Sequence, residues 1–345
     1  MANAPSLLDV WFWPLRLGGL FGPNVARDDS IAWTSANDVY AELPTMILRR
    51  FAGGGRNRRP IVVVAPFAVH DAGIADLAPG HSLVAALGNA GLGPVFLCVW
   101  KSATPEMAAF SIDCYLADLA AAVGLVRTQA RAAPDLVGLC QGGWMSLLYA
   151  AVFPESLRRL VVAGAPIDTS HPSPIADGAR MLAQNVVEAL IASGGGVVDG
   201  AQSLAAFRAS GGEEGSVAEV LQSDEVSEQT ASAYDAWNKR ALNLPGRYYA
   251  DVLNWLFREN RLARGTFPAF GRPSPLANVR APLYLLAGAE DRIAPPAQLR
   301  AAADLVGTPR AKIEYVEAPC GHLSLFMGAR TLGREWRHIA RWLAQ

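Results

Sequence analysis

The sequence predicts an α/β protein with a mostly parallel central sheet and a helical insertion. Three observations predict this architecture. Six continuous apolar runs are rich in β-branched residues and bounded by Pro or Gly, as strands buried on both faces are. Helical patterns lie between these runs, which is typical of parallel strands joined by crossover helices. The strand pattern is missing over one long interval, 169–274.

The expected elements follow one another in chain order. Strands are predicted at 60–67, 93–100, 134–140, 158–166, 281–289 and 311–319. Helices are predicted at 82–91, at 115–131 and at 142–153. The first of these helices ends at Gly91 and the last stops before Pro154, because neither residue continues a helix well.

The interval 169–274 contains helical fragments separated by glycine runs, followed by a helix-like stretch rich in aromatic residues. We therefore expect a core made of 51–168 and 275–345, a helical cap or lid at 169–274, and an N-terminal apolar arm at 1–50. Part of this arm, 7–23, is rich in Trp, Phe and Leu. Packing of this stretch on its own domain is favoured over binding to a lipid or polyester surface.

Composition excludes several classes of function. A net charge of −1 over 345 residues gives no electrostatic basis for binding nucleic acid or an anionic membrane. The four cysteines have unrelated spacings and form no CxxC pair, so neither a disulfide framework nor a zinc site is expected. The first residues lack the basic start of a signal peptide, and no apolar run reaches about 18 residues. We expect a cytoplasmic protein with no metal and no transmembrane segment.

The stretch DLVGLCQGG at 135–143 predicts a nucleophile elbow. A strand, the pattern Gly138-x-Cys140-x-Gly142 and a helix follow one another, and small flanking residues are needed because the turn is tight. The helix would point its N-terminus at Cys140, where it favours a thiolate and an oxyanion. The alternative is a small buried cysteine, but its place at a strand-to-helix junction favours a nucleophile.

Two later residues complete a candidate catalytic set. Asp291 follows the predicted strand 281–289, and His322 follows the last predicted strand. The order nucleophile, acid, histidine fits the α/β-hydrolase fold. Asp291 could instead be an ordinary capping residue, and Glu290 is a weaker candidate for the acid.

The chemistry expected of this set is acyl transfer. His322 would take the thiol proton, and the thiolate of Cys140 would attack an acyl carbon. The backbone N–H groups of Gln141 and of Phe67 or Ala68 would form the oxyanion hole. His70 lies in the same loop and could contact the acyl oxygen, although a structural role is favoured.

These residues resemble the polyhydroxyalkanoate (PHA) synthases, and more distantly the intracellular PHA depolymerases. The resemblance covers residues from about 60 to the C-terminus. It lies in 73–100, 136–161 and 237–262, and in the stretches GAEDRIAPP and CGHLSLF. The third stretch carries Trp237, a candidate substrate-binding residue together with His70.

The resemblance implies Cys140 as the acyl-bearing nucleophile, Asp291 as the acid and His322 as the base. It implies a 3-hydroxyacyl-coenzyme A substrate, a polyester product and no metal or redox cofactor. The polyester granule is then a further partner, and the oligomeric state stays open, with a homodimer among the options.

The chain departs from the synthase pattern at two places. Arg292 stands where synthases typically have His, and Val69-His70 replaces their usual Asn-Arg pair. Gln141 and the stretches 164–174 and 321–330 are similar to the depolymerases, which however generally lack the glycine found here at 142.

Three hypotheses follow: a synthase-like acyltransferase, favoured; a PHA depolymerase or oligomer esterase with the same triad; and a non-catalytic granule-binding protein. A synthase must keep water from the acyl-cysteine and a depolymerase must admit it, so the cap is expected to decide between them.

Overall fold

A computed structural model describes residues 31–51, 59–209 and 215–345 of the chain. Its centre is an eight-stranded sheet in the order β1-β2-β6-β3-β7-β8-β13-β14. The strands are β1 (Asn37–Glu42), β2 (Met46–Phe51), β3 (Ile61–Val64), β6 (Val95–Trp100), β7 (Asp135–Leu139), β8 (Leu160–Ala163), β13 (Leu283–Gly288) and β14 (Ile313–Ala318). The six strands from β6 to β14 are parallel, and β2 pairs antiparallel with both β1 and β6. The predicted fold class is confirmed.

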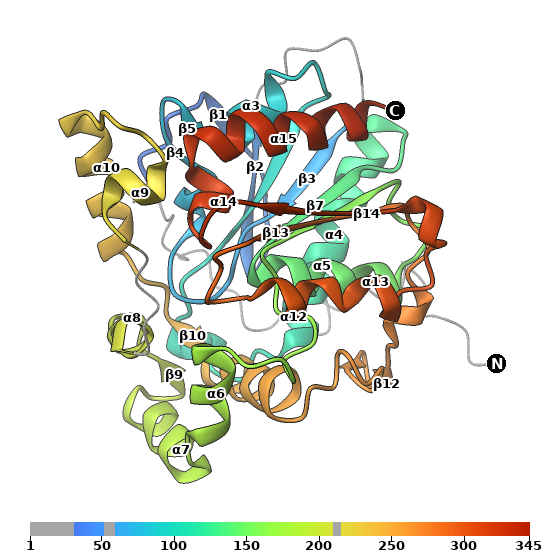
Figure 1. Cartoon of the computed structure of the whole chain (residues 1–345). Coiled ribbons are helices and arrows are strands. Elements are labelled where there is room, and N and C mark those ends of the chain that lie inside the picture. The colour runs from blue at the N-terminus through green and yellow to red at the C-terminus, as the bar shows by residue number, and fades with distance from the viewer. Residues whose placement is uncertain (1–30, 52–58, 210–214) are drawn as a thin grey trace.

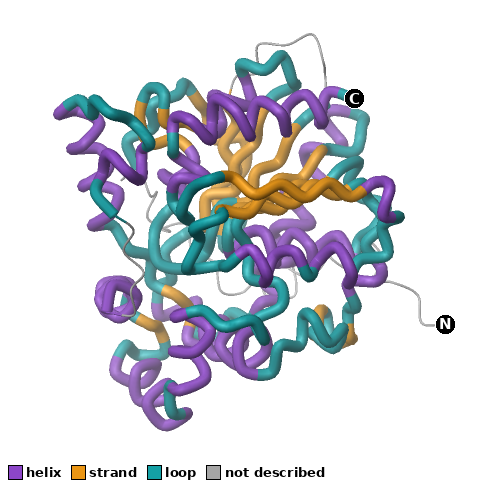
Figure 2. Tube along the Cα trace, viewed as in Figure 1, coloured by secondary structure: helices purple, strands orange, loops and turns teal. Residues whose placement is uncertain are grey.

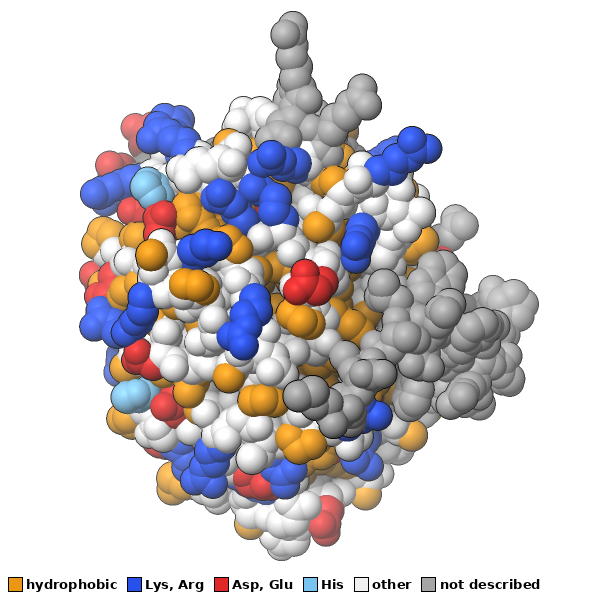
Figure 3. All heavy atoms as spheres, turned by 90° about the vertical axis from the view of Figure 1, so that its right-hand side faces the viewer, with side chains coloured by type: hydrophobic (Ala, Val, Ile, Leu, Met, Phe, Trp, Pro, Cys, Tyr) orange, Lys and Arg blue, Asp and Glu red, His pale blue; other side chains and the backbone are white. Residues whose placement is uncertain are grey.

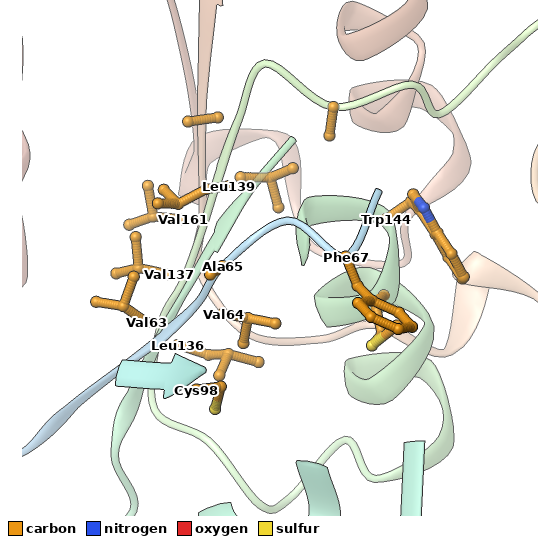
Figure 4. Packing of buried hydrophobic residues seen from close by; sticks show 14 of the residues in the cluster. Val63, Val64, Ala65, Phe67, Cys98, Leu136, Val137, Leu139, Trp144 and Val161 are labelled. Atoms are coloured by element: carbon orange, nitrogen blue, oxygen red, sulfur yellow. The ribbon is translucent and has the colours of Figure 1, made fainter. Parts of the chain in front are cut away.

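Five of the six parallel strands form the core, because they are buried on both faces; the edge strand β14 is largely half-buried. Each lies inside a predicted apolar run, and every residue of β3, β6, β7, β8 and β13 is buried. Figure 4 shows Val63, Val137 and Val161 side by side, in register across β3, β7 and β8. Rows of this kind pack the sheet against the helices on each face.

The hairpin β1–β2 corrects the prediction of an N-terminal arm at 1–50. These two strands belong to the central sheet, so the part of that range from Asn37 onward is part of the core. The interval 7–23, expected to pack on the domain, lies outside the described residues. The strand β2 was not predicted because it carries two charged side chains. In the hairpin Arg49 donates to Asn37 at 2.7 Å, and Arg50 pairs with Asp38 at 3.1 Å.

Helices cover both faces of the sheet (Figure 1). Two of them, α3 (Leu83–Gly88) and α15 (Ala329–Ala344), lie together on one face. The helices α4 (Ile112–Ala130), α5 (Gln141–Val152), α12 (Pro296–Arg300) and α13 (Ala302–Leu305) lie on the other. The remaining short elements of the core are β4 (Asp76–Ala78), β5 (His81–Ser82), α14 (Ser324–Met327) and four 3₁₀ turns at Ala72–Ala75, Pro105–Met107, Leu276–Asn278 and Arg310–Lys312. All three predicted helices are present.

The chain between β8 and β13 is mostly helical and lies to one side of the sheet (Figures 1 and 2). Its helices are α6 (Pro174–Met181), α7 (Gln184–Ser193), α8 (Gly200–Ala209), α9 (Val217–Leu221), α10 (Glu228–Lys239) and α11 (Gly246–Asp251), the last continued by a π-helical segment at Val252–Arg258. Two small pairs accompany them, β9 (Val197–Val198) with β10 (Leu244–Pro245), and β11 (Pro268–Ala269) with β12 (Arg272–Pro273).

Asn243 ties this helical segment to the core. Its N–H donates to the Ser102 hydroxyl at 2.9 Å, and its carbonyl accepts from the N–H of Ala103 at 2.9 Å. Its side-chain oxygen accepts from the N–H of Gly200 at 2.8 Å, inside the segment. One asparagine therefore fixes α8 and α11 relative to the loop after β6.

The face on the right-hand side of Figure 1 carries basic and acidic side chains interspersed with hydrophobic ones (Figure 3). No helix in the described ranges combines the length and the apolar character needed to cross a membrane.

Candidate active site

Cys140 stands between β7 and α5 in a backbone conformation that few non-glycine residues adopt. Its φ is +50° and its ψ is −116°, which is strained for a residue with a Cβ. The turn is held by two hydrogen bonds, from the Cys140 N–H to the Ala163 carbonyl at 2.9 Å and from the Gly143 N–H to the Cys140 carbonyl at 2.8 Å. In this conformation the thiol points away from the sheet, and Cys140 is only partly buried.

The glycines on either side of Cys140 stand where a side chain does not fit. A Cβ at Gly138 would lie 2.6 Å from the Ser146 hydroxyl, and one at Gly142 would lie 2.1 Å from the Val64 carbonyl oxygen. The missing side chain at Gly142 lets the first turn of α5 approach the end of β3. The first N–H groups of the helix therefore lie beside the loop that follows β3.

Asp291 and His322 come from the loops after the two neighbouring strands β13 and β14. His322 Nδ1 lies 2.7 Å from Asp291 Oδ2, and both side chains are buried. The other carboxylate oxygen accepts from the N–H groups of Ile293 and Ala294, at 2.9 and 2.8 Å. A carboxylate only accepts, so the imidazole proton lies on Nδ1. Nε2 is left for Cys140, whose side chain is hydrogen-bonded to His322.

The charges around His322 favour its protonated form. Burial alone lowers the pKa of His322. The negative charges of Asp291 and Cys140, together with the hydrogen bonds to both, outweigh burial and raise the pKa of His322 well above its usual range. In general, a protonated imidazole next to a cysteine sulfur stabilises the thiolate, which is the reactive form of a cysteine nucleophile.

Glu290, the weaker candidate for the acid, does not join this line. Its side chain is exposed and borders a different hollow, although its backbone N–H donates to the Cys320 carbonyl at 3.1 Å.

Cys140 and His322 line a cavity of about 400 Å³ under the helical segment. A second hollow of about 300 Å³ adjoins it, and the two share a mostly apolar set of lining residues. The shared residues are Ala68, Val69, Gln141, Ile175, Phe207 and Phe257. Loops after β3 and β7 supply one wall and the helical segment supplies the other, so the site lies between core and insertion.

His70 and Trp237 line the same cavity. His70 Nδ1 lies 3.0 Å from the Arg240 carbonyl, so it carries the proton, and Nε2 can only accept a hydrogen bond. A neutral His70 therefore cannot donate to an acyl oxygen, in contrast to one role considered from sequence. Burial lowers the pKa of His70, which keeps the ring neutral. Trp237 is fully buried, with its ring 4.3 Å from that of His70.

The residues predicted to form the oxyanion hole lie at the junction of the two hollows. Gln141 is the first residue of α5, so its N–H has no carbonyl partner within the helix. Its side chain accepts from Trp144 Nε1. Ala68 lines both hollows and Phe67 lines the second. Among the described residues, no group of three or more His, Cys, Asp or Glu is placed to hold a metal ion.

The chain is similar to several known proteins. The family described as "Protein of unknown function (DUF3141)" matches residues 50–345, and the chain belongs to this family. A poly(3-hydroxyalkanoate) polymerase subunit PhaC from Haloferax mediterranei is 25% identical over 289 residues, which are 79% of this chain and 56% of that protein. The PhaC subunit from Synechocystis is 26% identical over 329 residues, which are 92% of this chain and 86% of that protein. The chain thus spans little more than half the length of the first of these relatives.

Solved structures share the fold at low identity. A monoacylglycerol lipase from Paleococcus ferrophilus is 17% identical with a TM-score of 0.54, over 86% of this chain and 98% of that one. A hydrolase from Pseudomonas aeruginosa is 16% identical with a TM-score of 0.55, over 90% of this chain and 98% of that one. These likenesses confirm the α/β-hydrolase fold.

Proposed function

We propose that this member of the DUF3141 family is a PHA synthase-like cysteine acyltransferase that polymerises 3-hydroxyacyl groups from coenzyme A thioesters. The observation that carries the proposal is the hydrogen-bonded line from Asp291 through His322 to Cys140 in the wall of a largely apolar cavity. The similarity to PhaC polymerase subunits supports the substrate class. In this proposal residues 169–274 act as the cap over the site.

The first half-reaction loads Cys140. His322 Nε2 takes the thiol proton and the sulfur attacks the thioester carbonyl carbon. The oxyanion is held by the N–H groups of Gln141 and of Phe67 or Ala68. The carbon–sulfur bond to coenzyme A then breaks, and His322 returns its proton to the departing thiolate. The product is an acyl group bound to Cys140 as a thioester.

The second half-reaction makes the ester. His322 takes the proton of a 3-hydroxyl group, and the hydroxyl oxygen attacks the acyl carbon on Cys140. The bond from carbon to Cys140 sulfur breaks and an ester bond forms. His322 then reprotonates the released thiolate, and each cycle lengthens the chain by one hydroxyacyl unit.

The alternative is an intracellular PHA depolymerase or oligomer esterase with the same triad, in which water takes the place of the hydroxyl. Gln141 directly after the nucleophile, and the stretches 164–174 and 321–330, favour this alternative. A third hypothesis, a non-catalytic granule-binding protein, has less support because the three side chains are in contact.

The test offers the purified full chain both substrates. Release of coenzyme A from 3-hydroxybutyryl-coenzyme A, followed by chromatography, should be lost in Cys140→Ala and kept in Cys114→Ala. Liberation of 3-hydroxybutyrate from amorphous granules without coenzyme A release would replace the synthase with the depolymerase. If neither product appears, sedimentation with granules tests the non-catalytic hypothesis.

The proposal also has consequences for location and assembly. A coenzyme A thioester and a polyester granule put the protein in the cytoplasm, at the granule surface. Fluorescence of a tagged chain at granules checks the location, and sedimentation velocity with and without the thioester checks for a homodimer.

A further inference from the structure

Tyr248, in α11, carries a buried hydroxyl group that the triad does not use. The side chain is 1% exposed, and its hydroxyl has no hydrogen-bond partner in the part of the chain that the structure describes. A buried donor without a partner destabilises a protein unless a ligand or another function uses it. This hydroxyl therefore needs an explanation.

The position of Tyr248 supplies one. It lines the second hollow together with Phe67, Ala68 and Gln141, the three residues predicted to form the oxyanion hole. Its ring centre lies 5.0 Å from that of Phe67. Burial and, after it, the charge of Cys140 raise the pKa of Tyr248, so the phenol stays protonated and lies within electrostatic reach of the nucleophile.

We propose that the Tyr248 hydroxyl donates a hydrogen bond to the carbonyl oxygen of the acyl group on Cys140, beside the backbone donors of the oxyanion hole. An ester or thioester carbonyl only accepts hydrogen bonds, which suits a donor in a mostly apolar hollow. The bond strengthens as negative charge develops on that oxygen in the tetrahedral intermediate. This inference rests on the proposed acyl-cysteine chemistry and adds a side-chain donor to it.

Tyr115 provides a matched control within the same aromatic cluster. It is fully buried and its hydroxyl also has no partner among the described residues. Its ring lies 4.6 Å from Phe67 and 4.8 Å from Tyr248, yet it lines neither hollow. If an unpaired hydroxyl in this cluster only affects packing, the two tyrosines should respond alike to its removal.

The experiment compares Tyr248→Phe with Tyr115→Phe in the full chain, using 3-hydroxybutyryl-coenzyme A as acyl donor. We expect Tyr248→Phe to lower kcat about 100-fold, as the loss of an oxyanion donor does, with KM changed less than about two-fold. Tyr115→Phe should leave both constants unchanged. The unfolding temperature of Tyr248→Phe should equal or exceed that of the wild type, because the variant no longer buries an unpaired hydroxyl.

Four outcomes would overturn the inference. A Tyr248→Phe variant that keeps more than half of the wild-type kcat would remove Tyr248 from the reaction and leave the proposed function intact. Equal losses in both variants, or a loss that follows a lower unfolding temperature, would mean that the hydroxyl serves packing. A wild-type chain that transfers no acyl group to Cys140 from any thioester or ester would overturn the proposed function, and this inference with it.

Discussion

Replacing Asp291 with Asn tests whether the three side chains act as a unit. Asp291 Oδ1 accepts from two backbone N–H groups at 2.9 and 2.8 Å, so only an oxygen suits that position. In the variant the amide oxygen keeps these two bonds, and the NH2 group takes the place of Oδ2, 2.7 Å from His322 Nδ1. An NH2 group only donates, so Nδ1 must accept and the imidazole proton moves to Nε2.

The expected loss of activity in Asp291→Asn follows from this change in the tautomer of His322. With its proton on Nε2, His322 presents a donor to Cys140 and cannot take the thiol proton. The same substitution in a serine triad lowers kcat about 10⁴-fold. At about 1.4 kcal/mol per factor of ten, the expected loss is about 5 kcal/mol of transition-state stabilisation. The rate of coenzyme A release measures it, with Glu290→Gln, an exposed neighbouring carboxylate, as the control.

The pH dependence of cysteine alkylation gives a second readout. Asp291 helps to raise the pKa of His322, so the imidazolium beside Cys140 persists up to a higher pH than an ordinary histidine allows. Without the carboxylate, the imidazolium is lost at lower pH and the thiolate has no charged partner near neutrality. The alkylation profile of Cys140 with iodoacetamide, followed by mass spectrometry, should therefore move to higher pH. A variant that keeps a tenth of the acyl-transfer rate, or an unmoved profile, would refute this reasoning.

Three further substitutions and spectra test other parts of the structure. Gly142→Ala should lower the free energy of unfolding in urea by about 2–4 kcal/mol and abolish activity, since its Cβ would lie 2.1 Å from a carbonyl oxygen. Gly333→Ala, where no atom lies within 4 Å, should be neutral or stabilise by up to about 1 kcal/mol. The neutral His70 ring should carry its proton on Nδ1, and a protonated Nε2 in ¹⁵N spectra at neutral pH would contradict this. Burial raises the pKa of Asp118 to about 6, above the 3.8 of the free side chain, so its contribution to stability is present below pH 4 and lost by pH 6. Asp118→Asn should remove about 3 kcal/mol of that pH dependence, and unchanged urea unfolding between pH 4 and 7 would count against it.

The sequence predicts the parallel strands well and the hairpin poorly, for one physical reason. Strands buried on both faces need apolar residues throughout, and runs such as IVVV in β3 make that visible. In the hairpin β1–β2, the charged side chains of one strand are paired with polar side chains of the other, Arg50 with Asp38 and Arg49 with Asn37. A single strand carrying those charges looks like a surface segment, because its partner is not visible in the local pattern.

Part of the candidate site could likewise be predicted from the sequence, and part could not. Cys140, Asp291 and His322 could be proposed together because each follows a strand, and the ends of parallel strands meet at one edge. The position of the ring proton of His70 could not be predicted, because it depends on a hydrogen bond to the carbonyl of Arg240, 170 residues away in the chain. Tyr248 could not be predicted for the same reason, because only the folded helical segment brings its ring next to Phe67, in the loop after β3.

The two adjoining hollows bear on the choice between polymer and free acid. Both reactions begin from an acyl group on Cys140 and differ only in what attacks it. A hydroxyl held in the right orientation reacts as if present at about 10⁵ M or more, far above the concentration of water. A synthase therefore needs a bound and oriented hydroxyl more than a dry site. Closure of the cap stays a prediction for the direction of the reaction, and occupancy of the second hollow is a further determinant that can be tested. With that hollow filled by a hydroxyacyl chain, ester formation should prevail over hydrolysis even where water can enter.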